Sequence, residues 1–344
     1  MELLENEIEG NSSKAFCKGM IISVHKDRYE IMADDSCMYF GRLKSAYYRD
    51  PQAIFPTVGD NVCFENIASG DVIIVETLPR HSCFFRANPT QGLPDQAVAA
   101  NFDYVFLVMS LNRDFHIGKL TRYLAAASKA GGTAVLLLSK TDLITPQELS
   151  EYLVKVCQLA PKLMVLPVST YSGEGMEQLR NLLPGKKAVF LGSSGVGKSS
   201  LVNALMGEEV METGGIREAD SQGRHTTTSR QCFFMSNGGI LMDTPGMRNI
   251  MMSRADGDFS DIFGKIERLM SSCKFRNCTH KNEPGCAVQE ALKNGSLDEK
   301  QYREYLQLLM EEQRAKGREK HRLKRLSRPG KYSKKDRKWN EKSL

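Results

Sequence analysis

The chain of 344 residues lacks any apolar run long enough to cross a membrane. Its most apolar stretches, 105–109 and 134–138, are short, whereas a spanning helix needs about 20 apolar residues. Such short runs are typical of buried strands. The N-terminus, MELLENEIEG, is acidic and has neither the basic start nor the apolar centre of a signal peptide. We therefore expect a cytoplasmic protein without a membrane partner.

The sequence also lacks a cysteine pattern suited to disulfides. Its nine cysteines are an odd number, and six are scattered, at positions 17, 37, 63, 83, 157 and 232. The other three, Cys273, Cys278 and Cys286, lie close to His280. Three thiolates and one imidazole at this spacing suit tetrahedral Zn²⁺ with no open position, so they predict a structural metal. The alternative is three free thiols beside an unrelated histidine.

A strong overall charge is absent as well, since the net charge is only +6. The basic residues concentrate instead in the tail at 314–342, which reads GREKHRLKRLSRPGKYSKKDRKWNEK over most of its length. Such a tail is either a disordered, solubilising segment or an arm that neutralises the phosphates of nucleic acid. Charge alone leaves both alternatives open.

Short alternating segments predict a small β-barrel near the N-terminus. They lie at 19–25, 28–33, 37–44, 61–66 and 72–77, and turn residues separate them. Five strands over about 70 residues suit an OB-fold, a barrel often used on nucleic acid. An SH3-like barrel has a similar pattern and remains the alternative.

Strands that alternate with helices predict a doubly wound α/β domain from about residue 95 to 250. The predicted strands are 102–109, 134–139, 164–169, 188–192 and 240–243, and the helices are 118–130, 145–159 and 198–206. A helical stretch follows residue 256, and another helix is expected to begin near Ser296. Ser296 and Glu299 form a potential capping box there, ahead of an apolar face at Tyr302, Tyr305, Leu306 and Leu309.

A phosphate-binding motif lies between the strand at 188–191 and the helix at 198–206. Its residues fit the pattern Gly-x₄-Gly-Lys-Ser: Gly192, Ser193, Ser194, Gly195, Val196, Gly197, Lys198 and Ser199, with Ser200 following in the helix. In this setting, backbone N–H groups and the helix N-terminus face an anion. Lys198 is expected to reach the β- and γ-phosphates of a nucleotide, and Ser199 to bind Mg²⁺. The alternative is a glycine-rich turn with an exposed lysine.

A base-reading motif follows the strand at 134–138. Ser139-Lys140-Thr141-Asp142 resembles the [Asn/Thr]-Lys-x-Asp motif of GTPases, with Ser139 in place of Asn or Thr. The Asp142 carboxylate would accept hydrogen bonds from the ring N–H and the exocyclic amine of guanine, a donor pair that adenine lacks. Lys140 would lie along the base plane. Ser169 matches the guanine-supporting Ser-Ala-x loop, in which Thr170 replaces alanine.

The magnesium site is expected to draw on two further segments. Asp243 begins Asp-Thr-Pro-Gly after the strand at 240–242, so we expect it to bind Mg²⁺ and Gly246 to offer its N–H to the γ-phosphate. Switch I should lie at 223–228, and among Thr226–Thr228 we assign Thr227 to the Mg²⁺ shell. Met247 stands where Ras-type enzymes place a water-orienting glutamine, which predicts slow intrinsic hydrolysis. His225 is the nearest candidate to orient water, with a solvated histidine as the alternative.

The order of these motifs is permuted, because the base-reading residues precede the phosphate-binding motif. Together the features resemble the bacterial small-ribosomal-subunit-dependent GTPases of the RsgA type over nearly the whole chain. The strings that carry the resemblance are GSSGVGKSSLVNAL at 192–205, GRHTTT at 223–228, DTPGMR at 243–248 and CKFRNCTHKNEPGC at 273–286. The resemblance implies a late assembly factor that binds the small subunit and its rRNA, and whose GTP hydrolysis the subunit stimulates.

The expected fold is α/β: a circularly permuted P-loop GTPase domain, preceded by a small OB-type β-barrel and followed by a mainly helical zinc-binding domain. The expected bounds are 1–14 for a disordered segment, 15–86 for the barrel, 87–254 for the GTPase domain, 255–310 for the zinc-binding domain, and 311–344 for a basic helix and tail. GTP and GDP are the expected ligands, and the chain is expected to be monomeric. The alternatives are a permuted GTPase acting on the large subunit or another RNA, and an RNA-binding chaperone with a degenerate nucleotide site.

Overall fold

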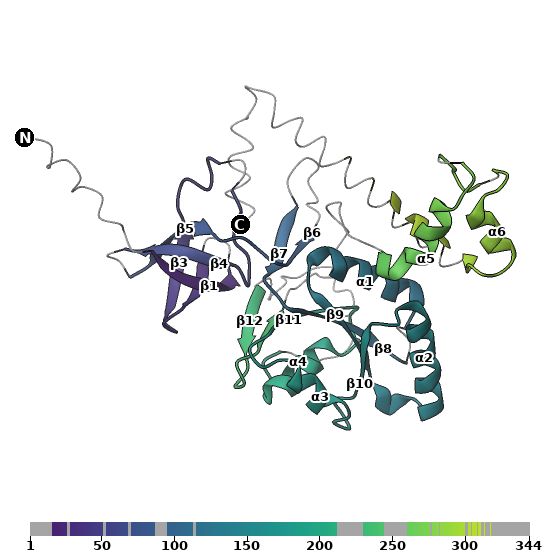
Figure 1. Cartoon of the computed structure of the whole chain (residues 1–344). Helices are drawn as coiled ribbons and strands as arrows, with labels where there is room; N and C mark the ends of the chain where they lie inside the picture. Colours follow the sequence, from purple (N-terminus) through teal and green to yellow (C-terminus); the bar gives the residue numbers. More distant parts are fainter. Residues whose placement is uncertain are drawn as a thin grey trace, which may run out of the picture. The chain divides into compact units, whose positions relative to one another are not determined.

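The structure, a computed structural model, describes two compact parts of the chain (Figure 1). It covers residues 16–25, 28–50, 53–67, 70–86, 95–112, 115–211, 230–243, 260–275, 277–281 and 283–299, and scattered residues from 302 to 317. The first unit ends at Pro79 and the second begins at Arg80. The segments predicted at 1–14 and along the basic tail after 317 lie outside the described residues.

Five strands form the first unit. They are β1 Cys17–Val24, β2 Tyr29–Ala33, β3 Met38–Leu43, β4 Asn61–Asn66 and β5 Val72–Thr77. They are ordered β1-β2-β3-β5-β4, and pairing of β1 with β4 closes the barrel. After β3 the chain forms β4, and the next strand, β5, then lies beside β3 and pairs parallel with it. This is the strand order of an OB-fold, so the OB prediction is confirmed over the SH3-like alternative.

The barrel is filled by residues at alternate positions. In β2, Tyr29, Ile31 and Ala33 are buried, while the intervening residues are half-buried. This period of two places one face of each strand in the interior. The buried members of the core are Ile21, Tyr29, Ile31, Ala33, Leu43, Tyr47, Val62, Phe64, Val72 and Ile74.

The second unit contains the predicted α/β sheet. Its strands are β8 Tyr104–Ser110, β9 Thr133–Ser139, β10 Met164–Val168, β11 Lys187–Gly192, β12 Arg230–Phe234 and β13 Ile240–Asp243. The order is β10-β9-β8-β11-β13-β12. The first five run parallel, and β12 pairs antiparallel with β13. The continuous apolar runs in the sequence correspond to the parallel strands, because those strands are buried on both faces.

Four helices accompany this sheet: α1 Ile117–Ala130, α2 Pro146–Leu159, α3 Met176–Asn181 and α4 Lys198–Met206. Figure 1 shows α3 and α4 on one side of the strands and α1 on the other. The core on the α3–α4 side takes Phe106 and Val108 from β8, which are alternate residues of that strand. The α2 helix begins with a full capping box between Thr145 and Glu148, which fixes its start where the sequence predicts it.

A two-stranded hairpin that the sequence did not predict precedes the sheet. β6 Cys83–Arg86 pairs antiparallel with β7 Gln96–Ala100, with a register shift between Phe84 and Phe85. Phe84 stacks on Phe102 with ring centroids 5.0 Å apart. β7 is rich in alanine and therefore carries a weak strand signal.

The C-terminal part of the second unit is helical, as predicted. It contains α5 Ser260–Ser271, α6 Ala287–Lys293 and a helical stretch that starts at Glu299. The predicted capping box at Ser296 is wrong: the Tyr302 N–H donates to the Asp298 carbonyl, whereas the Ser296 hydroxyl donates to the Ala291 carbonyl at 3.3 Å. The helix therefore starts after Asp298, which is also a favoured N-cap residue. In the described part of the chain, no helix is both long and apolar enough to span a bilayer.

Gly175, in the loop between β10 and α3, offers a sharp test of the packing. A Cβ there would lie 2.0 Å from the Pro167 carbonyl oxygen, and the φ of Gly175 is +70°. We expect Gly175→Ala to lower the free energy of unfolding by about 3 kcal/mol, from left-handed strain plus overlap. Gly173→Ala is the matched control, since Gly173 has a φ of +81° and open space around it. Equal urea midpoints for the two variants would contradict the clash.

Candidate nucleotide and metal sites

The predicted nucleotide-binding residues that the structure describes converge on one edge of the sheet. Gly192 ends β11 beside Val108 of β8, and Ser139 ends β9 beside Ser110. Ser169 directly follows β10, and Asp243 ends β13, the parallel neighbour of β11. The carboxyl edge of a parallel sheet is where α/β folds bind ligands. The order of the strands along the chain differs from their order in the sheet. β8 to β10 come before β11 along the chain, whereas β11 lies beside β8 in the sheet.

The loop from β11 to α4 has the backbone of a phosphate-binding loop. Gly195 and Gly197 have φ values of +76° and +100°, a conformation that favours glycine. A Cβ at Gly192 would lie 2.5 Å from the Val108 carbonyl oxygen, so this position needs glycine as well. Val196 is buried in the core with residues of α4, and this burial holds the loop in place. Ser193 is half-buried and Ser194 is exposed, on the open side of the loop.

The Lys198 ammonium lies within the curve of this loop. Its Nζ donates to the carbonyl oxygens of Gly192 at 2.8 Å and Ser193 at 2.5 Å. Lys198 is the first residue of α4, and Ser199 and Ser200 follow in its first turn, half-buried. A cation and the positive end of a helix therefore face the same space, which suits a phosphate chain.

Two hydrogen bonds tie the predicted base-reading loop to the phosphate loop. The buried Ser139 hydroxyl donates to the Val196 carbonyl at 2.7 Å, and Lys140 Nζ donates to the Gly195 carbonyl at 2.8 Å. Lys140 itself has a φ of +64°. Ser139 thus joins the two loops, although it departs from the usual Asn or Thr.

The Asp142 carboxylate is held by the next loop. The Ser169 hydroxyl donates to Asp142 Oδ1 at 2.5 Å and accepts the backbone N–H groups of Tyr171 and Ser172, each at 3.1 Å. These contacts orient the hydroxyl toward Asp142, and they leave Asp142 Oδ2 and further lone pairs of Oδ1 to accept other donors.

The predicted magnesium and switch residues are only partly described. Asp243 is half-buried, and its backbone pairs with Gln231 of β12. His225, Thr226–Thr228, Gly246 and Met247 lie outside the described residues. Their roles therefore stay predictions.

Helix α1 contacts both the phosphate loop and the C-terminal helices. The Tyr123 hydroxyl lies 3.4 Å from the Ser193 hydroxyl, and Arg122 donates to Gln307 Oε1 at 3.0 Å. Ala125 packs in the same cluster as Phe263 and Tyr305. The sequence did not predict that this helix connects the phosphate loop with the C-terminal helices, because single polar residues on an amphipathic helix do not form a recognisable motif.

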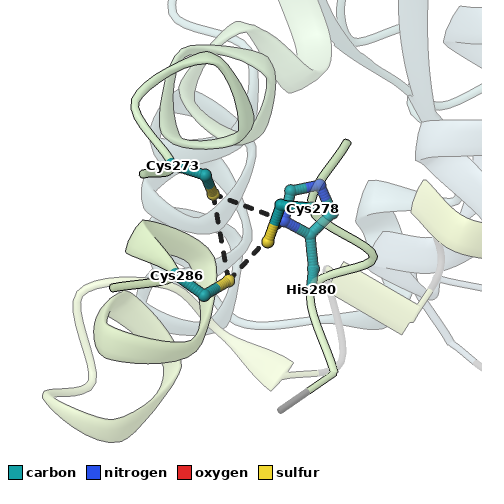
Figure 2. A group of neighbouring side chains, drawn as sticks. All are labelled: Cys273, Cys278, His280 and Cys286. Atoms are coloured by element: carbon teal, nitrogen blue, oxygen red, sulfur yellow. Dashed lines mark hydrogen bonds between the residues drawn. The ribbon is translucent and has the colours of Figure 1, made fainter. Parts of the chain in front are cut away.

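The four predicted metal ligands come together in the C-terminal part (Figure 2). Their ligand atoms, from Cys273, Cys278, His280 and Cys286, all lie within 4.8 Å of one another. The Sγ atoms of Cys273 and Cys286 are 3.9 Å apart, and His280 Nδ1 is 3.4 Å from the first and 3.6 Å from the second. Ideal tetrahedral Zn²⁺ has S–S edges of ~3.8 Å and S–N edges of ~3.6 Å. The donor set therefore fits a zinc ion bound through Nδ1 of the histidine.

Local structure fixes these ligands. Cys286 is the N-cap of α6, its Sγ accepts the Gln289 N–H at 3.5 Å, and Gln289 Nε2 donates to the His280 carbonyl at 2.7 Å. Burial raises the pKa of the Cys278 thiol to about 11. Burial also opposes ionisation of Cys273, but hydrogen bonds from the N–H groups of Val288 and Ala287 and from the Cys286 and Cys278 thiols together lower that pKa. A divalent cation would supply the charge that keeps both as thiolates.

Glu283 stabilises the loop that carries His280. Glu283 accepts the backbone N–H groups of Thr279 at 2.8 Å and Lys281 at 2.9 Å, and it also accepts the Thr279 hydroxyl. These bonds, with the Thr279 hydroxyl foremost, lower the Glu283 pKa to about 2. The carboxylate thus stays ionised, and it holds the two residues that flank His280, Thr279 and Lys281.

In a circularly permuted GTPase, the loops that read the guanine base come before the phosphate-binding loop along the chain. This chain has that order, and hydrogen bonds join its base-reading loop to its phosphate loop. The RsgA GTPase family model matches residues 77–253. The chain belongs to this family, and it is a GTP-hydrolysing enzyme. The ABC transporter family model also matches, over residues 180–328, a range that begins one strand before the phosphate loop common to both classes.

Named relatives agree with this membership. The chain is 39% identical to "Small ribosomal subunit biogenesis GTPase RsgA 1" of Listeria monocytogenes, over 85% of this chain and 83% of that protein. It is 43% identical to "Small ribosomal subunit biogenesis GTPase RsgA 2" of Vibrio parahaemolyticus, over 74% and 70%. Among solved structures, YjeQ from Thermotoga maritima matches with a TM-score of 0.62 and 25% identity, over 87% of this chain and 99% of that chain. The fold of YloQ, a circularly permuted GTPase, matches with a TM-score of 0.57.

Proposed function

We propose that this protein hydrolyses GTP to GDP and phosphate during late maturation of the small ribosomal subunit, and that binding to the subunit stimulates the hydrolysis. The observation that carries the proposal is the connection of Asp142 to the phosphate loop. Ser169 orients the carboxylate, while Ser139 and Lys140 join its loop to the carbonyls of Val196 and Gly195. A guanine base and a triphosphate could therefore bind across one continuous surface. The relatives' names supply the ribosomal part of the proposal.

In this proposal Lys198 exchanges the carbonyls of Gly192 and Ser193 for the β- and γ-phosphates of GTP. Ser199, Asp243 and Thr227 hold Mg²⁺, which neutralises charge on the phosphate oxygens when bound. Gly246 offers its N–H to the γ-phosphate, and His225 orients the attacking water. Asp142 selects guanine, because its carboxylate matches a donor pair that adenine lacks.

We further propose one structural zinc ion on Cys273, Cys278, His280 and Cys286. The three distances that join the ligand atoms of Cys273, His280 and Cys286 support it, and four protein ligands would leave no open position on the ion. The ion would fix the loop between α5 and α6. That loop displays Lys274 and Lys281, which are exposed and can neutralise phosphates.

The partner in this proposal is the small subunit through its rRNA, bound by a monomer in the cytoplasm. Two features support an RNA partner: the OB-type barrel, a fold used on oligonucleotides, and the basic residues of the sequence after 314. GTP would order the switch I segment and so favour the bound state, and hydrolysis would release it.

The test is GTP turnover with and without isolated small subunits. We expect at least about a tenfold rise with small subunits, because stimulation of slow GTPases in trans reaches several orders of magnitude. His225→Ala, assayed in parallel, should retain GDP binding and lose the stimulated rate. Large subunits at the same concentration are the control. Equal rates with and without small subunits would refute the proposal, and stimulation by large subunits alone would reassign the partner.

A further inference from the structure

Glu174 connects the two loops that flank the proposed base site. It lies between β10 and α3, and its Oε2 accepts the Thr141 hydroxyl at 2.6 Å. Thr141 is the residue before Asp142 and is itself buried. The Glu174 carbonyl also accepts the Ser169 N–H at 3.0 Å. No motif assigned Glu174 or Thr141 a role.

These contacts close a ring of hydrogen bonds around Asp142. Thr141 is bonded to Glu174, Glu174 to Ser169 through the backbone, and Ser169 to Asp142 at 2.5 Å. Asp142 and Thr141 are neighbours in the short 3₁₀ turn Thr141–Leu143, so the ring returns to its start. Ser169 fixes the carboxylate, and Glu174 fixes the backbone that carries it. A group held at both points is pre-organised for directional bonds.

We propose that Glu174 is a positioning residue for guanine recognition, acting through Thr141 on the Asp142 carboxylate. The inference rests on the proposed function, in which Asp142 accepts the ring N–H and the exocyclic amine of guanine. Both bonds form only when the carboxylate lies in the plane of the guanine base and at a fixed position beside it. Among the described residues, the bond from Ser169 is the one side-chain contact that would still tie the 3₁₀ turn to the next loop without the Glu174 bond.

The geometry of Gly175 supports the same reading. Its Cβ position is blocked by the Pro167 carbonyl, and the Gly173 N–H donates to the Ser169 carbonyl at 3.0 Å. The backbone on both sides of Glu174 is therefore fixed. A carboxylate on a fixed backbone can hold the Thr141 hydroxyl even though Glu174 is exposed to water.

The experiment compares GTP with inosine triphosphate, which lacks the exocyclic amine. We expect the wild type to bind GTP more tightly by roughly 10- to 100-fold, the usual effect of a hydrogen bond to a charged group. Glu174→Ala should reduce this ratio by about tenfold, through weaker GTP binding with kcat nearly unchanged. Thr141→Val should do the same, and the double variant should lose no more than either single variant.

Three controls separate positioning from general stability. Glu174→Gln and Thr141→Ser keep an acceptor and a donor, so they should restore most of the ratio. Glu177→Ala, at an exposed glutamate in the first turn of α3, should leave it unchanged. A purely structural role would weaken both nucleotides equally and leave the ratio intact, which would overturn the inference. A wild type that does not distinguish the two nucleotides would instead refute the proposed role of Asp142, and the inference with it.

Discussion

Lys198→Ala is expected to lower GTP turnover by roughly 10²–10³-fold, the loss typical of one charged group that stabilises the transition state. The Lys198 ammonium lies in the curve of the phosphate loop, bonded to Gly192 and Ser193. Alanine removes the only side-chain cation that the structure places at those two carbonyls, in the residues described. Single-turnover hydrolysis, with and without small subunits, would measure the change.

Lys155→Ala is the matched control for this experiment. Lys155 is exposed on α2, where its Nζ lies 5.4 Å from the centre of the Tyr152 ring. It has the same charge and length as Lys198 and lies in an element that does not carry the phosphate loop. If both variants kept the wild-type rate, the nucleotide site would be degenerate, and the RNA-chaperone alternative would gain support.

If the proposed zinc ion is bound, Cys286→Ser should reduce the zinc content from one ion per chain to about 0.1 or less. Serine has nearly the same size, but its oxygen is a poor zinc ligand, and a structural zinc site contributes on the order of 10 kcal/mol to folding. Cys286 also caps α6 and is buried against Val288 and Tyr302 in the C-terminal core. The loss of zinc should therefore increase amide hydrogen exchange across 260–299. Metal analysis and hydrogen exchange measure the two effects.

Cys157→Ser provides the comparison for the zinc prediction. Cys157 is an exposed free thiol on α2, so its replacement should leave metal content and exchange unchanged. A Cys286→Ser protein that still held one zinc ion would show that the cluster is not the binding site. Full zinc loss with unchanged exchange would show that the ion does not stabilise the module.

The buried parallel strands were the part of the fold that sequence predicted best. β13 and α4 agree with their predicted bounds, because a continuous apolar run or a glycine-bounded helix carries a strong local signal. β6, β7, β12, α3 and α6 were missed. β7 is alanine-rich, α3 has only six residues, and α6 starts at the metal ligand Cys286, where the thiol acts as an N-cap. Ser296 was wrongly chosen as a cap, since Asp298 two residues later competes for the same role.

For the site, sequence named the groups that face the ligand but not those that hold them. Gly192, Lys198 and the four metal ligands follow from spacing, because phosphate and zinc demand particular residues at particular intervals. Glu174 and Tyr123 act through contacts with residues far away in the chain, Thr141 and Ser193. An exposed glutamate between two glycines has no local signal for such a contact, so only the folded backbone reveals it.

The position of β8 has a consequence for synthesis. β8 lies between β9 and β11 in the sheet, and all of its residues after Tyr104 are buried. β9 follows soon after β8, but β11 ends at Gly192, about 80 residues later, so one edge of β8 has no partner until then. At translation speeds of about 5–20 residues per second, this gap lasts roughly 4–16 s. During that interval the growing chain presents a bare, apolar strand edge, the kind of surface that recruits chaperones or other nascent chains.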